Sequence, residues 1–144
     1  MKRIAPVFPR RQDWPERLAE LIEARREAEF AWGTHDCGMF AADAVVAITG
    51  ADPLQEWRGA YDTEEGADAI IAGFGGYEAF MVSAFRAFGA PECPACLLQR
   101  GDVGLVRYGN NLSAAVSLGH CAAVPGISGL SFLAPRMFVR GWAI

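Results

Sequence analysis

The pattern of apolar and polar positions divides the chain into a helical first part and an extended second part. Between residues 13 and 88, apolar residues recur every three or four positions, which is the spacing of amphipathic helices. From residue 102 onward, short apolar runs alternate with turn residues, as in strands joined by tight hairpins. This order predicts an α+β fold in which N-terminal helices pack on a C-terminal antiparallel sheet.

Local start and stop signals give the expected bounds of these elements. The first helix should begin at Asp13-Trp-Pro15, because proline suits the first helical turn, and should fade near Ala28. The second helix should pack one apolar face on the sheet, made of Phe40, Ala44, Val45 and Ile48. The other three helices are expected at 37–49, 63–72 and 77–88, and the strands at 102–108, 112–118, 121–124, 130–133 and 138–144.

The loop that follows the second helix is irregular but carries Trp57 and Tyr61. Such aromatic side chains either line a cleft or anchor a loop to the core. The sequence leaves both interpretations open.

Length and composition predict one folded domain. With 144 residues, 52% hydrophobic and 21% charged, the chain is long enough to bury a core without metal or disulfide staples. We expect residues 1–12 to form a basic flexible arm and 13–144 a single domain, because the first eleven residues contain four basic and no acidic side chains and lack apolar periodicity. No signal peptide or transmembrane segment is expected, since the apolar runs fall far short of about 18 residues.

Charge and cysteine content exclude several classes of partner and cofactor. The net charge is −4 and the folded part shows no basic groove, so nucleic acid is not an expected partner. Cys93-Pro-Ala-Cys96 has the spacing of a metal or redox site, and His120-Cys121 would complete four ligands. A second paired-cysteine knuckle is missing, however, so we expect no metal and no other cofactor. The sparse cysteines fit synthesis in a reducing cytosol.

The strongest candidate for chemistry is Cys37, which stands where a polar loop becomes the second helix. A thiol in the first helical turn faces unpaired backbone N–H groups and the positive end of the helix dipole, which favour the thiolate. Asp36 is the expected N-cap, and His35 provides an imidazole in the same loop. The alternative interpretation is that Cys37 is a small buried apolar residue of the core.

These features resemble the NlpC type of papain-like cysteine peptidases. The resemblance rests on Asp36-Cys37 at a helix start and on Gly101-Asp-Val103 at the opening of the first main strand. More narrowly, residues 30–144 look like a group of small proteins from bacteriophage and prophage tail modules. That likeness is carried by Trp32-Gly-Thr-His-Asp-Cys37, Thr49-Gly-Ala-Asp-Pro53, Arg58-Gly-Ala-Tyr61 and the closing Arg140-Gly-Trp-Ala-Ile144.

The resemblance implies that Cys37 is the nucleophile and that its backbone N–H is an oxyanion donor. In such enzymes the base opens the strand after the first main strand. If that strand is 112–118, its base position is Ser113; if it begins at His120, a pair of Cys37 with His120 is restored and 112–118 becomes an extra strand. Both alignments remain open at this point.

Two functions therefore follow from the resemblance. In the first, the protein cleaves peptide cross-bridges of bacterial peptidoglycan during phage entry, with Cys37 and His120 as catalytic residues and Asp36 and His35 in support. In the second, it is a catalytically degenerate structural component of the tail tip or hub. Both imply synthesis in the host cytoplasm, assembly into the virion tail, and other tail-tip or hub proteins as partners.

Overall fold

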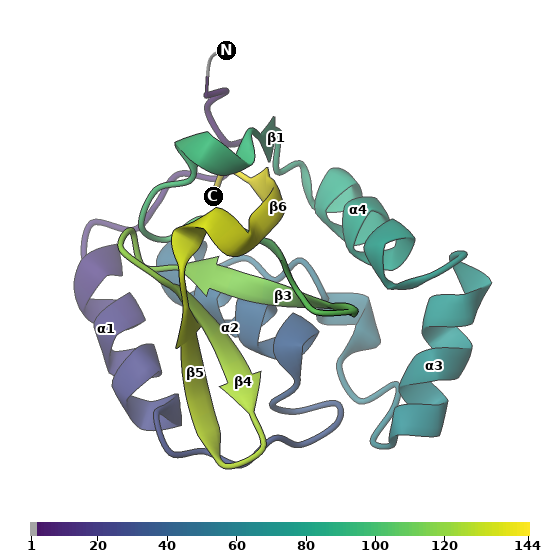
Figure 1. The fold of residues 1–144 in the computed structure, drawn as a ribbon. Coiled ribbons are helices and arrows are strands. Elements are labelled where there is room, and N and C mark those ends of the chain that lie inside the picture. The colour runs from purple at the N-terminus through teal and green to yellow at the C-terminus, as the bar shows by residue number, and fades with distance from the viewer. Residues whose placement is uncertain (1–2) are drawn as a thin grey trace.

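Helices precede a sheet in the computed structural model, which describes residues 3–144. In this range the α-helices are α1 (Trp14–Arg25), α2 (Cys37–Thr49), α3 (Glu64–Gly73) and α4 (Tyr77–Phe88). The strands are β1 (Glu92–Cys93), β2 (Val103–Tyr108), β3 (Asn111–Ser117), β4 (Ala122–Gly126), β5 (Gly129–Leu133) and β6 (Phe138–Trp142). The predicted α+β class is confirmed (Figure 1).

The helix bounds follow their caps. The side chain of Asp36 accepts a hydrogen bond at the start of α2, and Gly50 ends that helix with a left-handed φ of 81°. Thr63 caps α3 in the same way as Asp36 caps α2. The first helix ends at Arg25, three residues before the predicted Ala28, and is followed by a turn.

The sheet is antiparallel throughout, in the order β1-β6-β2-β3-β4-β5. Five strands lie where the sequence predicted them, within two residues at each end. Strand β1 was not predicted, because Pro91 and Pro94 closely flank its two residues and indicate a loop. Proline is compatible with a strand at the edge of a sheet, and β1 occupies an edge beside β6.

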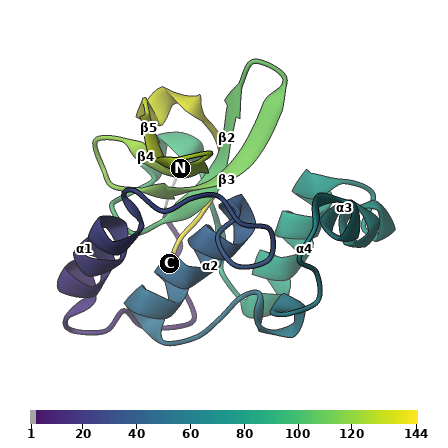
Figure 2. The ribbon, with the colours of Figure 1, turned by 90° about the horizontal axis from the view of Figure 1, so that it is seen from below.

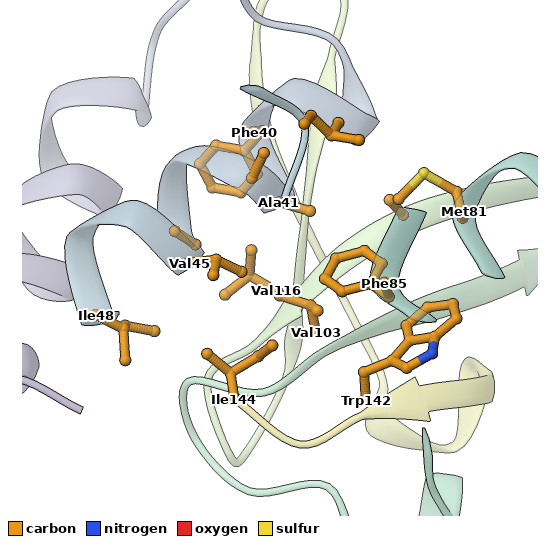
Figure 3. Close-up of a cluster of buried hydrophobic side chains, with 14 of the residues drawn as sticks. Phe40, Ala41, Val45, Ile48, Met81, Phe85, Val103, Val116, Trp142 and Ile144 are labelled. Atoms are coloured by element: carbon orange, nitrogen blue, oxygen red, sulfur yellow. The ribbon is translucent and has the colours of Figure 1, made fainter. Parts of the chain in front are cut away.

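Helix α2 is central in the layered arrangement. Figure 2 shows it beneath the sheet, with α1 on one side and α3 and α4 on the other. The four predicted core residues of α2 have no exposed surface. Figure 3 shows Val45 and Ile48 near Val116 of β3 and Ile144, while Trp142 stacks on Phe85 of α4 at 4.7 Å between ring centroids. The prediction that this helix is a core element is confirmed.

Residues 3–12, which belong to the predicted basic flexible arm over 1–12, contact the rest of the fold in this structure. The carboxylate of Asp102 is fully buried and pairs with both Arg3 and Arg10. Phe8 stacks on Phe88, with ring centroids 4.7 Å apart. These contacts could not be predicted from apolar periodicity, because the main ones are ionic and span 99 and 92 positions of the sequence. Residues 1–2 of the predicted arm lie outside the described residues.

Within residues 3–144, no helix is long and apolar enough to cross a membrane.

Candidate functional site

Cys37 is the first residue of α2 and lies in the wall of a cleft with a volume of about 410 Å³. The cleft is bounded by the loop before α2, by Tyr61, by α3 and α4, and by the start of β3. Its lining is mainly apolar and aromatic, which is typical of ligand sites in proteins. The lining side chains include Phe30, Trp32, Tyr61, Glu64, Asp68, Ile71, Tyr77, Phe80, Leu112 and Ser113.

Asp36 shapes the floor of this cleft. Its carboxylate is buried and accepts hydrogen bonds from the backbone N–H of Met39 at 2.8 Å, the backbone N–H of Gly33 at 2.9 Å and the hydroxyl of Tyr61 at 2.5 Å. The predicted N-cap is therefore confirmed, and its acceptor positions are engaged by structural partners. A carboxylate held in this way is poorly placed to accept a proton from Cys37.

A glycine allows the loops around Asp36 to meet. Gly33 has a left-handed φ of +82°, and a Cβ atom built there would lie 2.1 Å from the carbonyl oxygen of Tyr61. Any other residue at position 33 would force the two loops apart. Gly33 of the first motif thus allows Tyr61 to approach Asp36.

The environment of the Cys37 thiol opposes ionisation. Burial is the largest effect and, with the negative charge of Asp36, raises the pKa of Cys37 to about 11, against a hydrogen bond with Ser113 that lowers it. The expectation that the helix N-terminus favours a thiolate is therefore wrong. A physical reason is that Asp36 already neutralises this end of α2, where it accepts the Met39 N–H.

Strand β3 places Ser113 beside Cys37. The strand pairs with β2 from Val103 through Tyr108, and Ser113 lies opposite Val106. Residues 112–118 are thus the strand that directly follows the first main strand, so the alignment with Ser113 at the base position is the one that the topology supports. A serine hydroxyl is too weak a base to take a proton from a thiol.

His120 lies elsewhere. It is exposed in the turn between β3 and β4 and lines a separate pocket of about 530 Å³ with residues of α1. That pocket shares no lining residue with the Cys37 cleft. The predicted catalytic pair of Cys37 and His120 is not assembled, because β3 is long enough to carry its far end away from α2's first turn.

His35 also faces away from the cleft lining. Its Nδ1 lies 2.7 Å from a guanidinium nitrogen of Arg25, and its ring packs edge-on against Phe40. An arginine can only donate, so Nδ1 is the acceptor and Nε2 carries the proton. Burial and the Arg25 charge lower the pKa of His35, against Asp43 and Asp36, which raise it. His35 is thus a buried side chain that pairs with Arg25, whereas the sequence predicted a supporting role beside Cys37.

An ion-pair network that joins α1, α2 and the following loop was not predicted from the sequence. Asp43 on α2 accepts from Arg25 of α1 at 2.8 Å and from Arg58 at 2.8 Å, and Arg58 also pairs with Asp52 at 3.0 Å. The acidic residues and arginines at these positions were the only indication of the network in the sequence. Their interleaving in the sequence predicts pairing only once α1, α2 and the following loop are known to meet.

Two aromatic residues of the irregular loop settle the alternatives left open. Tyr61 lines the cleft and bonds to Asp36, whereas Trp57 packs edge-on against Phe74 and Phe80. On the opposite wall, the hydroxyl of Tyr77 accepts the backbone N–H of Ala114 at 3.1 Å, and burial raises its pKa. Tyr61 therefore joins the irregular loop to the start of α2, and Tyr77 joins α4 to β3.

The four hypothetical metal ligands are dispersed. Cys93 is buried beside Arg3, Cys96 is exposed, and Cys121 lies in the pocket of His120. Among the described residues there is no group of three or more histidine, cysteine, aspartate or glutamate side chains that could hold an ion. That the protein holds no metal stays a prediction for elemental analysis.

Residues 9–144 match the model of a family described as a domain of unknown function (DUF6950), and the chain belongs to this family. Comparisons with curated proteins and with solved structures gave no match.

Proposed function

We propose that the protein is a tail-tip component of a bacteriophage or prophage with an NlpC-type, papain-like fold, and that its cleft binds a partner instead of cleaving a substrate. The phage origin rests on the resemblance of the motifs between Trp32 and Ile144. The non-catalytic role rests on the geometry around Cys37.

The observation that carries this proposal is the surroundings of the Cys37 thiol. The chain has two histidines, and both stand outside the cleft, His120 in another pocket and His35 against Arg25. The position from which a base would act is taken by Ser113. Nucleophilic catalysis by cysteine needs a proton acceptor within hydrogen-bond reach or a thiol of low pKa, and this site supplies neither.

The motif residues support a binding site in another way. Gly33, Asp36 and Tyr61 fix the loop that forms one wall, and the pairing of Arg58 with Asp43 fixes the segment behind it. A rigid wall lowers the entropy cost of binding, because fewer groups have to be ordered when the ligand arrives. The motifs then describe a preformed cleft, which a scaffold protein needs as much as an enzyme does.

A second candidate, a peptidoglycan endopeptidase, is favoured by one specific observation. Cys37 still lies at the N-terminus of a helix and in the wall of an open cleft, as a nucleophile would. Cleavage would require Asp36 to accept the thiol proton, although its oxygens already receive three hydrogen bonds. The enzyme candidate therefore stands second.

Digestion of purified peptidoglycan separates the two candidates. Newly freed amines are counted for the wild type and for Cys37→Ala, with Cys96→Ala as the matched control because Cys96 is an exposed thiol outside the cleft. We expect all three proteins to give the same background. Amine release by the wild type and Cys96→Ala that Cys37→Ala abolishes would establish the enzyme. His120→Ala, tested in parallel, should change nothing under either candidate.

The tail-tip assignment has its own test. Particles purified from the bacterium that encodes the chain are fractionated into heads and tails, and each fraction is examined by mass spectrometry. The proposal expects the chain in the tail fraction, bound to hub or tip proteins. The proposal would be contradicted if the chain were found in the host cytoplasm alone and intact tails lacked it.

A further inference from the structure

We propose that the pocket containing His120 is a second binding site, which takes a carboxylate carried on an apolar chain, as in an acidic segment of a partner protein. This site lies outside the Cys37 cleft and does not depend on the function proposed for it. The pocket has a volume of about 530 Å³ and lies between α1 and the sheet, at the turn that joins β3 to β4.

The charges of the pocket lining favour an anion. Arg26, Arg100 and His120 converge on this pocket, and Glu23 is the single acidic side chain among its lining residues. Glu23 lies 3.1 Å from Arg26 and balances that cation. The guanidinium of Arg100 has no ion-pair partner in the part of the chain that the structure describes. An uncompensated arginine in a hollow of a protein with a net charge of −4 is complementary to an anion.

The backbone of Arg100 is held in place by Arg10. Its carbonyl oxygen accepts a hydrogen bond of 2.8 Å from Arg10, and Arg10 is itself anchored on the buried Asp102. Burial raises the pKa of the neighbouring Cys121 thiol, and the charge of Arg100 opposes that effect. The backbone of Arg100 is thus fixed, and Arg100 lines the pocket.

Apolar side chains of the pocket fit the apolar part of the ligand. Ile22, Leu118 and Phe132 line the same pocket, and the guanidinium of Arg26 lies over the Phe132 ring at 5.5 Å. A fully hydrated ion would leave these side chains uncovered. A carboxylate on an aliphatic chain would cover them and present two oxygens to the planar guanidinium of Arg100.

Inorganic phosphate fits less well. Ile22 and Glu23 of the pocket wall belong to the last turn of α1, where the carbonyl end of the helix dipole is negative, and Glu23 adds a carboxylate. A doubly charged anion would meet more repulsion there than a singly charged one. The chemistry therefore favours a carboxylate, provided either by a glutamate side chain or by the C-terminus of a partner chain.

Calorimetric titration of the full chain with short peptides tests this site. The probes are acetyl-Leu-Glu-Leu-amide, the isosteric acetyl-Leu-Gln-Leu-amide, acetyl-Leu-Leu with a free C-terminus, and inorganic phosphate. We expect the two carboxylate peptides to bind at least about tenfold more tightly than the glutamine peptide and than phosphate. Whichever carboxylate peptide binds more tightly identifies the source. Equal binding of the glutamate and glutamine peptides, or a preference for phosphate, would overturn the proposal.

Variants locate the binding. Arg100→Gln should weaken binding of the carboxylate peptide about tenfold. The matched control is Arg107→Gln, which replaces an exposed arginine on β2 outside the pocket and should change the affinity less than about twofold.

A second test, within the unmodified protein, is protection of Cys121 from iodoacetamide at a fixed alkaline pH, mapped by mass spectrometry. The peptide should slow alkylation of Cys121 and leave the exposed Cys96 unaffected. Unprotected Cys121, or equal loss of affinity in both arginine variants, would place the peptide elsewhere and refute this site.

Discussion

Replacement of Asp102 by asparagine tests the attachment of the N-terminal segment to the fold. The Asp102 carboxylate is fully buried and accepts hydrogen bonds from Arg3, from Arg10 at 3.1 Å, and from the backbone N–H groups of Gln99 at 2.7 Å and Ile144 at 3.1 Å. It therefore joins both ends of the chain to the start of β2. Asparagine has nearly the same shape but no charge, and its NH₂ group would face donors.

The expected cost follows from what the substitution leaves behind. The side chains of Arg3 and Arg10 are 21% and 19% exposed, so their charges would stay largely out of water without a counter-ion. Removing one partner of such a pair typically costs about 3–5 kcal/mol. With a urea slope of about 1–3 kcal/mol/M for a domain of this size, the unfolding midpoint should fall by about 2 M.

Urea unfolding followed by circular dichroism measures this change, with Asp62→Asn as the matched control. Asp62 is exposed and forms no ion pair in the described structure, so its substitution should stay within about 0.5 kcal/mol. Removal of residues 1–11 should destabilise the protein by a similar amount, because Asp102 is then buried without a cation. The two changes together should cost much less than their sum, since they break the same interaction. A loss below about 1 kcal/mol for Asp102→Asn would refute the argument.

Three further predictions concern α2 and its surroundings. Phe40→Ala should lower the free energy of unfolding by about 3–5 kcal/mol in urea, because Phe40 is fully buried, and a near-neutral result would remove α2 from the core. Alkylation of Cys37 by iodoacetamide, mapped by mass spectrometry, should keep accelerating up to about pH 11, and a plateau near neutral pH would reveal an activated thiol. The lowered pKa of His35 means that the unfolded chain binds more protons, so stability should decrease as the pH falls below about 6.5. His35→Phe should flatten that slope in urea titrations between about pH 5 and 7.5, and an unchanged slope would exclude His35 as its source.

The sequence predicted the helices and most strands because their signals are local. Asp36 and Thr63 cap helices within three residues, and Gly50 and Gly89 end them with left-handed backbone. Such contacts need no knowledge of the rest of the chain. Strand β1 was not predicted, because a strand of two residues is too short to show the alternation of a strand. Its extended conformation depends on pairing with β6, about 50 residues away.

The N-terminal segment could not be placed for a different reason. Its attachment consists of Arg3 and Arg10, which reach a carboxylate 99 and 92 positions later. A run of basic residues at a terminus has the same appearance in the sequence whether it is solvated or paired. The informative residue was Asp102, an acid directly before an apolar strand. Its burial could be known only from the sheet, where it lies at the entry to β2 with the chain's end beside it.

The candidate site shows how far a motif can predict chemistry. Asp36-Cys37 located the cleft correctly, because a cap and a helix start are local features. The partner of Cys37 depended on which residue of β3 faces α2, and one strand position decides between the two faces of a sheet. Ser113 faces the thiol, and His120 follows the far end of the strand.

The same geometry explains why a cysteine at a helix N-terminus need not be reactive. The Asp36 carboxylate interacts with the positive end of the α2 dipole and accepts a hydrogen bond from the backbone N–H of Met39. Tyr61 and the backbone N–H of Gly33 donate further hydrogen bonds to the same carboxylate. A carboxylate in that position stabilises the helix but adds a negative charge beside Cys37, which raises the cost of a thiolate. Activation of a cysteine in this position therefore requires a cation or a base whose effect on the thiol exceeds that of the negatively charged cap. Arg25 and His35, which have that chemistry, are bound to each other and lie outside the lining of the cleft.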